Sequence, residues 1–191
     1  KGHFQLRDPL SRFIPAFGEA KVRIAGELTS VTDSLEESRR PIQVRDMLTH
    51  TAGLANNYIG DVAAYRTHMT QPRPKNNAEQ IARLASFPLN YHPGEEWQYS
   101  SATSVVGHLA EIISGRSLDV FLEENLFEPL DMKDTHFYLD DTKSGRLTTQ
   151  YTPGEDEKIT PQDPGDQESR WITSERSIFS GSGGLVSTAR D

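Results

Sequence analysis

The sequence contains no cysteine, which excludes disulfides, thiolate zinc sites, iron–sulfur clusters and cysteine nucleophiles together. It has no apolar run near the roughly 18 to 20 residues that a membrane-spanning helix needs, and no basic-then-apolar start typical of a signal peptide. Lys and Arg number 20 against 28 Asp and Glu, which gives a net charge of -8. Because no basic run occurs either, we expect no nucleic-acid partner.

Several motifs with known chemistry are also missing. The sequence has no G-x-S-x-G, no H-E-x-x-H, no G-x-x-x-x-G-K-[ST] and no G-x-G-x-x-G. The six histidines are scattered, and none pairs with another at helical spacing, so we expect neither a metal site nor a bound cofactor. The absence of internal repeats argues against solenoids and propellers.

The composition is that of a globular protein. Of 191 residues, 35% are hydrophobic and 25% are charged, which fits one ordinary domain or part of a larger one. The chain starts without methionine. Near its other end the pattern predicts a helix that begins at Ser187 or Thr188, only a few residues before the sequence stops. We therefore expect the chain to be truncated at both ends.

Two helices are predicted in the first half. Residues 42–54 form a short amphipathic pattern in which Gly53 is placed as the C-terminal cap. Asn77 followed by Gln80 is typical of a capping box, and this helix should end at Phe87, which precedes a proline.

The clearest helix follows Ser100 and Ser101, one of which should cap it, and ends at Gly115. Its inward positions follow helical spacing: Val105, Leu109, Ile112 and Ile113. A further helix should run from Ser117 to about residue 128.

Strands are predicted at 22–28 and 135–139. Residues 151–170 are rich in proline and acidic side chains and poor in apolar ones, so we expect an exposed acidic loop within the same domain.

Tyr99 lies at the entrance of the clearest helix, where unpaired backbone N–H groups and the helix dipole favour negative charge. A phenol ionises near pH 10, so a tyrosine base needs a nearby cation or hydrogen-bond donors. The alternative from the residues alone is that Trp97 and Tyr99 only pack the start of the helix.

Four segments occur in an order that resembles one superfamily: VRDMLTHTAGL (44–54), PGEEWQYSS (93–101), LFEPLDMKDT (126–135) and GGLVSTARD (183–191). Together they resemble the serine β-lactamase and penicillin-binding-protein superfamily, and within it the class C β-lactamase-like hydrolases with their carboxylesterase branch. The resemblance implies an α/β (α+β) β-lactamase-like fold, with an antiparallel sheet flanked by helices and a helical subdomain. Residues 1–191 would be the central part of one such domain.

The resemblance also implies a serine enzyme that works through an acyl-enzyme, in which the serine and lysine of an S-x-x-K motif act with a tyrosine. Tyr99 matches the tyrosine of the family's Y-x-N motif and is the candidate catalytic residue. No S-x-x-K occurs in the 191 residues, so the nucleophilic serine and its lysine are expected upstream. The run Lys143-Ser144-Gly145 is similar to the family's K-T-G but lies in the wrong order, which indicates a coincidental loop.

Ser101 holds the place where class C β-lactamases carry asparagine, and it is the candidate substrate-binding residue, although it is also placed as a helix N-cap. A hydroxyl offers fewer hydrogen bonds than an amide, which favours a small ester over a lactam. The alternatives are a β-lactamase or D-Ala-D-Ala peptidase acting on an amide, and a non-catalytic binding protein with the same fold.

Other polar residues near these motifs have structural interpretations. His50, at the end of its short helix, is expected to make a structural hydrogen bond or a dipole interaction. Gly183 and Gly184 are expected to let the backbone pass close to another element. His92 is expected to be solvated.

Overall fold

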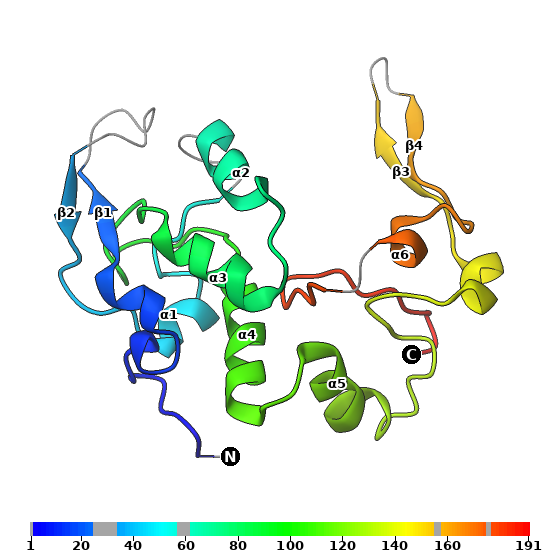
Figure 1. Cartoon of the computed structure of the whole chain (residues 1–191), viewed down its shortest axis with the longest axis horizontal. Coiled ribbons are helices and arrows are strands. Elements are labelled where there is room, and N and C mark those ends of the chain that lie inside the picture. The colour runs from blue at the N-terminus through cyan, green and yellow to red at the C-terminus, as the bar shows by residue number, and fades with distance from the viewer. Residues whose placement is uncertain (1, 25–33, 57–61, 155–157, 175–176) are drawn as a thin grey trace. The chain divides into compact units, whose positions relative to one another are not determined.

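The structure is a computed structural model that describes residues 2–24, 34–56, 62–154, 158–174 and 177–191 (Figure 1). It divides into two compact units, one made of residues 1–121 and 178–183 and the other of residues 122–177 and 184–191. That the chain is the central part of one domain stays a prediction.

The first unit holds most of the helices and one pair of strands. Its elements are the 3-10 helices η1 (Leu10–Arg12) and η2 (Pro15–Glu19), the strands β1 (Lys21–Arg23) and β2 (Leu35–Glu37), and the helices α1 (Val44–Leu48), α2 (Val62–Thr70), α3 (Asn77–Ser86) and α4 (Ala102–Ser114). β1 and β2 pair antiparallel, with Val22 opposite Glu36. The predicted strand 22–28 is therefore confirmed at its start, and its remainder from residue 25 lies outside the described residues.

Helix α4 contacts two other helices of the first unit. Both α1 and α3 pack against it, and α2 packs on α3 (Figure 1). Val105 and Leu109 are buried as predicted, whereas Ile112 is 42% exposed, so its predicted inward position is wrong. The largest buried apolar side chains come from every part of the unit: Leu10, Val22, Ile42, Val44, Met47, Leu54, Ile81, Leu84, Leu89 and Val105.

The end of α1 differs from the prediction. The helix ends at Leu48 and is followed by His50 with φ of 55°, so Gly53 is not its C-terminal cap. The sequence pattern placed the left-handed residue at the glycine because glycine adopts positive φ without steric cost. His50 adopts it instead, because its carbonyl and ring are held by tertiary hydrogen bonds that the sequence pattern does not reveal.

Helix α3 begins one residue earlier than predicted. Asn76, not Asn77, is its N-cap, and the Asn76 side chain accepts a hydrogen bond of 2.9 Å from the amide of Glu79. Its end before Pro88 and the end of α4 at Gly115 are confirmed, the latter with φ of 68°.

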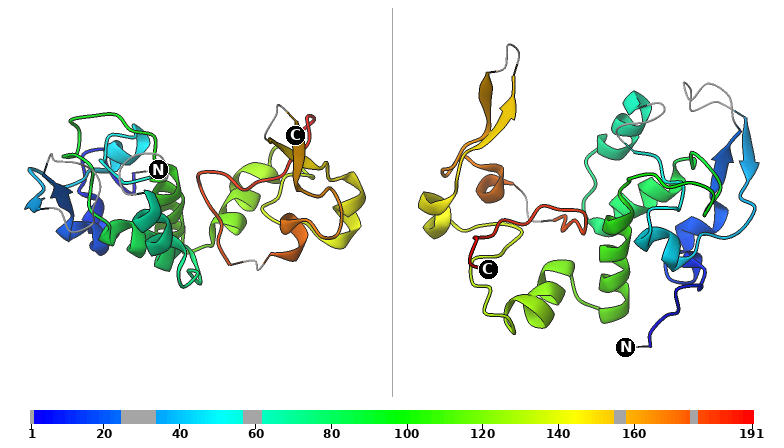
Figure 2. Two further views of the ribbon diagram at one scale, coloured as in Figure 1. Left: turned by 90° about the horizontal axis from the view of Figure 1, so that it is seen from above. Right: turned by 180° about the vertical axis from the view of Figure 1, so that it is seen from behind.

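The second unit is built from short elements. Helix α5 (Leu118–Leu122) lies where the two units meet in the sequence, and it continues into a π-helical segment, η3 (Glu123–Phe127). The other elements are the 3-10 helix η4 (Asp141–Arg146), the strands β3 (Gln150–Pro153) and β4 (Ile159–Asp163), and α6 (Arg170–Thr173). β3 and β4 form an antiparallel hairpin that projects beyond α6 (Figures 1 and 2). The segment expected to be a loop, 151–170, thus contains most of a largely exposed hairpin.

Two predictions in the second unit are wrong. Residues 135–139 form no strand but only an isolated bridge between His136 and Val186. Residues 187–191, predicted to begin a helix, are not helical. The mixed α/β class with antiparallel pairing is confirmed. Within the described ranges, no helix has both the length and the apolar character that crossing a membrane requires.

Candidate active site

Residues 50–56 and 89–100, which carry two of the resembling motifs, lie side by side. Three backbone hydrogen bonds join them, in which the amides of Asn90, Gly94 and Gln98 donate to the carbonyl oxygens of Gly53, Thr51 and His50 at 2.7, 2.7 and 3.0 Å. These backbone hydrogen bonds hold the two segments together along their length. Residues about 50 positions earlier in the sequence therefore set the position of Tyr99.

Two glycines here have positive φ, and one of them allows this close pairing. Gly53 has φ of +78°, and a Cβ atom there would strain the backbone and lie 2.2 Å from the carbonyl oxygen of Tyr91, which would push the two segments apart. Gly94 has φ of +88°, and a Cβ atom there would strain the backbone and lie 2.3 Å from the guanidinium nitrogen of Arg40 that donates to Asp46.

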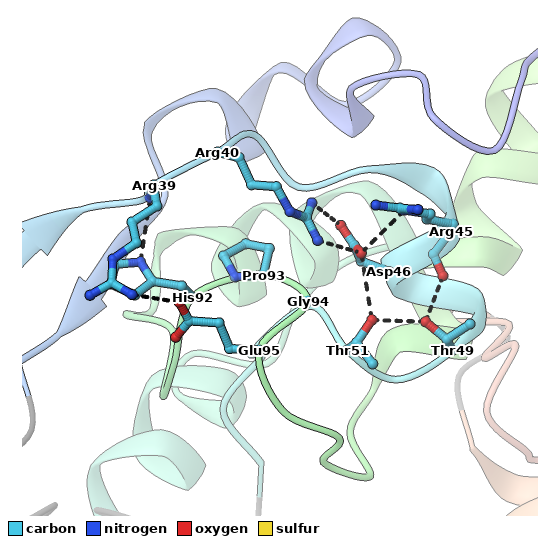
Figure 3. Close-up of a pocket in the computed structure, with 10 residues that line it drawn as sticks. All are labelled: Arg39, Arg40, Arg45, Asp46, Thr49, Thr51, His92, Pro93, Gly94 and Glu95. Carbon is cyan, nitrogen blue, oxygen red and sulfur yellow. Dashed lines mark hydrogen bonds and ion pairs between the residues drawn. The ribbon is translucent and has the colours of Figure 1, made fainter.

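An ion pair supports the other side of the same loops (Figure 3). The Arg40 guanidinium donates to both carboxylate oxygens of Asp46, at 2.7 and 2.9 Å, and Asp46 is only 2% exposed. This hydrogen bonding to Asp46 raises the pKa of Arg40. The amide of Gln43 also donates to Asp46, which fixes the start of α1.

A polar depression of about 650 Å³ lies over this ion pair, lined among others by Arg45, Thr49, Thr51 and His92 (Figure 3). His92 is 5% exposed, with Nε2 at 3.0 Å from Glu36 and Nδ1 accepting from the amide of Arg39 at 3.4 Å. The expectation that His92 is solvated is wrong, because its partners lie more than 50 positions away in the sequence and no local pattern reveals them.

Tyr99 combines a fixed backbone with an exposed side chain. The side-chain amide of Asn56 donates to its carbonyl oxygen at 2.6 Å, and the amide of Ser100 donates to His50 Nδ1 at 3.4 Å. The His50 and Tyr99 rings lie 5.1 Å apart at 31°. Tyr99 is 52% exposed, and within the part of the chain that the structure describes its hydroxyl has no hydrogen-bond partner. The structural contacts expected of His50 are present, and the catalytic role of Tyr99 stays a prediction.

Ser101 occupies the N-cap position of α4, but its side chain makes no capping hydrogen bond. The Ser101 side chain lies close enough to the hydroxyl of Tyr65, a residue of α2 that is 3% exposed, to influence its ionisation. Burial raises the pKa of Tyr65, and the nearby Ser101 side chain partly offsets that effect. The capping role of the Ser101 side chain is therefore wrong, and its substrate-binding role stays a prediction.

Residues 178–183 return to α4 and pack on its first turns. A Cβ atom on Gly181 would lie 2.3 Å from the carbonyl oxygen of Thr103 and 3.2 Å from the Cα of Gly107. The close approach expected of Gly183 is thus made by Gly181, since a Cβ atom on Gly183 would meet nothing within 4 Å. Hydroxyl pairs complete the contact, with Ser104 Oγ at 3.0 and 2.8 Å from the Oγ atoms of Ser180 and Ser182.

Sequence reasoning missed three residues that organise this site. Asn56 holds Tyr99, Tyr65 lies beside Ser101, and Asn77 exchanges two hydrogen bonds with the backbone of Phe179, at 2.8 and 3.0 Å. Each acts on a residue between about 35 and 102 positions away, so no motif or local spacing signals it. Among the described residues, no group of three or more His, Asp or Glu side chains is placed to hold a metal ion.

The chain as a whole, residues 1–191, matches the sequence profile of the family described as Beta-lactamase. It is 30% identical over 191 residues to Protein Rv1367c of Mycobacterium tuberculosis, covering 100% of this chain and 46% of the relative. It is 27% identical over 168 residues to Esterase EstB of Burkholderia gladioli, covering 85% of this chain and 39% of that enzyme. The chain therefore belongs to the Beta-lactamase family and spans less than half the length of these curated relatives.

Solved structures agree with this assignment. Unliganded simvastatin synthase (LovD) from Aspergillus terreus superimposes with a TM-score of 0.68 at 27% identity, over 96% of this chain and 44% of that one. EstCE1, described as a hydrolase with promiscuous acyltransferase activity, gives a TM-score of 0.69 at 24% identity, over 97% of this chain and 49% of that one. At 24% identity, the match to EstCE1 is evidence for the fold alone. Both matches confirm the β-lactamase-like fold.

Proposed function

We propose that the protein to which this chain belongs is a serine hydrolase of the β-lactamase type that cleaves a small ester through an acyl-enzyme, with Tyr99 handling protons. The observation that carries the proposal is that the backbone of Tyr99 is fixed by Asn56 while the residue itself is half exposed. Family membership supports the reaction class, since relatives carry the names esterase and acyltransferase.

In the proposed reaction a serine hydroxyl, supplied with its lysine from outside these 191 residues, attacks the ester carbonyl carbon. Tyr99 as phenolate takes the serine proton and delivers it to the departing alkoxide, which leaves as the alcohol. Water then attacks the acyl-enzyme, gives its proton through Tyr99 to the serine oxygen, and releases the carboxylic acid. The neighbouring lysine ammonium would favour the phenolate, which a free tyrosine reaches only near pH 10.

The test uses the full-length protein and two matched tyrosine variants. A positioned acid–base group contributes about a hundred- to ten-thousand-fold in rate, so Tyr99→Phe should lower kcat for a short acyl ester by that factor. Tyr151→Phe is the control, because Tyr151 is exposed to a similar degree (54% against 52%) but lies on the hairpin of the other unit. Activity of Tyr99→Phe within a few-fold of wild type would remove Tyr99 from the mechanism.

A second measurement addresses the nucleophile. The intact mass of the full-length protein, before and after a fluorophosphonate serine probe, should increase by one adduct. A protein that gains no adduct and hydrolyses no ester would instead be a non-catalytic binding protein with this fold.

The substrate class is tested by comparing esters with amides. Ser101 lies beside the Tyr65 hydroxyl, and a serine hydroxyl offers fewer hydrogen bonds to a lactam side-chain amide than an asparagine would. We expect turnover of a short acyl ester to exceed that of a cephalosporin and of a D-Ala-D-Ala peptide. Preferred turnover of either amide would make the protein a β-lactamase or a D-Ala-D-Ala peptidase.

A further inference from the structure

Trp97 is the most exposed aromatic side chain near Tyr99. Trp97 is 67% exposed and Tyr99 is 52% exposed, while Gln98 between them is only 7% exposed. The rings of both aromatic residues contact His50, with centroid distances of 6.2 Å for Trp97 and 5.1 Å for Tyr99. The two exposed rings therefore flank one imidazole on one side of the chain.

The backbone beneath Trp97 is held in place, unlike that of a mobile surface loop. The amide of Gln98 donates to the His50 carbonyl at 3.0 Å, and the Gln98 side-chain oxygen accepts from Asn90 Nδ2 at 3.1 Å. Gly94 and Asn56 fix the chain on either side of it. Because this backbone is already fixed, covering the indole with a ligand orders little further protein backbone.

Leaving this indole uncovered forgoes a large stabilisation. Burying a large apolar side chain stabilises the buried state, and an aromatic ring stacked on it adds a further favourable contact. Two acidic side chains precede Trp97 in the sequence, Glu95 and Glu96, of which Glu95 is paired with Arg39 at 2.6 Å, and the chain carries a net charge of -8. A neutral apolar group fits this surface better than an anionic one.

We propose that Trp97, with the His50 ring beside it, binds a neutral aromatic part of the ester substrate while the ester carbonyl lies at Tyr99. The inference rests on the proposed function, because it assigns the substrate class of the same site. Trp97 would act in binding and specificity and take no part in proton transfer.

The kinetic test compares benzyl acetate with ethyl acetate in the full-length protein. Trp97→Ala should lower kcat/KM for benzyl acetate by about ten- to a hundred-fold, mainly through KM, because a stacked aromatic contact of this size is lost. The same variant should leave ethyl acetate within about two-fold, and Trp97→Phe should retain most of the benzyl preference. Trp171→Ala, at the only other tryptophan of the chain, is the matched control and should change neither substrate.

A binding test keeps this inference separate from the proposed chemistry. Benzylacetone, the ketone analogue of benzyl acetate, cannot be hydrolysed, and its binding should change the fluorescence of wild type and of Tyr99→Phe but not of Trp97→Phe. That pattern in a protein without esterase activity would leave the aromatic site standing and remove the proposed function. Two results would overturn the inference. One is an equal loss of kcat/KM for both esters in Trp97→Ala. The other is fluorescence of Trp97 in the full-length protein that neither benzylacetone nor the quencher acrylamide changes.

Discussion

The side-chain amide of Asn56 donates a 2.6 Å hydrogen bond to the carbonyl oxygen of Tyr99, across 43 positions of sequence. Asn56 is 5% exposed, so the bond lies in a region with little competing water. Through this contact the segment after the first resembling motif fixes the tyrosine of the second. Asn56 is thereby a positioning residue for the proposed reaction.

Asn56→Ala should lower both stability and activity. Removing a hydrogen bond made by a buried side chain costs about 1 to 3 kcal/mol, and Tyr99 would lose its anchor. Urea unfolding and ester kinetics on the full-length protein measure the two effects. Asn76→Ala is the control, because loss of the α3 N-cap costs about 1 kcal/mol without touching the site. If Asn56→Ala and Asn76→Ala have the same kcat, Asn56 does not position Tyr99 for the reaction.

The proximity of the Ser101 side chain to the buried Tyr65 hydroxyl gives a second prediction. Ser101→Ala should destabilise the protein by about 1 to 3 kcal/mol in the wild-type background, because it removes the polar neighbour of a buried phenol hydroxyl. In a Tyr65→Phe background the same substitution should cost much less. If KM of Tyr65→Phe/Ser101→Ala is higher than KM of Tyr65→Phe, Ser101 takes part in substrate binding. If the two KM values are equal, the role of Ser101 is structural.

Gly181→Ala should destabilise the contact between residues 178–183 and α4. The new Cβ atom would lie 2.3 Å from the carbonyl oxygen of Thr103, which belongs to a helix and cannot move freely. We expect a loss of about 1 to 3 kcal/mol in urea unfolding, typical of overpacking. Gly145→Ala, where a Cβ atom meets nothing within 4 Å, should stay within about 0.5 kcal/mol. Equal stability of the two variants would contradict the close packing at Gly181.

The fourth prediction concerns pH and the second unit. Arg146 donates two hydrogen bonds of 2.7 Å to Asp134 and, with help from Lys143, lowers the pKa of that carboxyl to about 2. An unfolded aspartate titrates near pH 3.9, so this pair stabilises the fold fully above that pH. The stabilisation is lost as the pH falls toward 2.

Carboxyl NMR titration of the full-length protein measures this shift directly. Arg146→Gln should raise the Asp134 midpoint toward the ordinary value, while Arg170→Gln, which removes an arginine bonded to Gln150 and Asp163, should not move it. An Asp134 midpoint near 4 in the wild type would show that the ion pair does not persist in solution.

The sequence predicted the features that depend on neighbouring residues. The start and end of α4, the end of α3 before Pro88 and the mixed α/β class all follow from helical spacing, proline geometry and a glycine that adopts positive φ. The resembling motifs led to the family, which the whole chain matches. These signals act within a few residues, so they can be read without knowing the fold.

Features that depend on distant partners were predicted poorly. The proline-rich segment 151–170 holds a hairpin, and 135–139 is not a strand, because strand formation depends on which segment lies alongside. His92 is buried because Glu36 and the amide of Arg39 satisfy its two ring nitrogens.

By itself, the sequence determined the family, the principal helices and Tyr99 as the residue to examine. Only the tertiary structure decided that Asn56 anchors Tyr99, that Ser101 lies beside Tyr65 and that Trp97 stays exposed beside His50. The reason is physical. A contact between residues about 35 to 50 positions apart depends on how the chain folds back on itself, and the conformational preferences of neighbouring residues do not determine that.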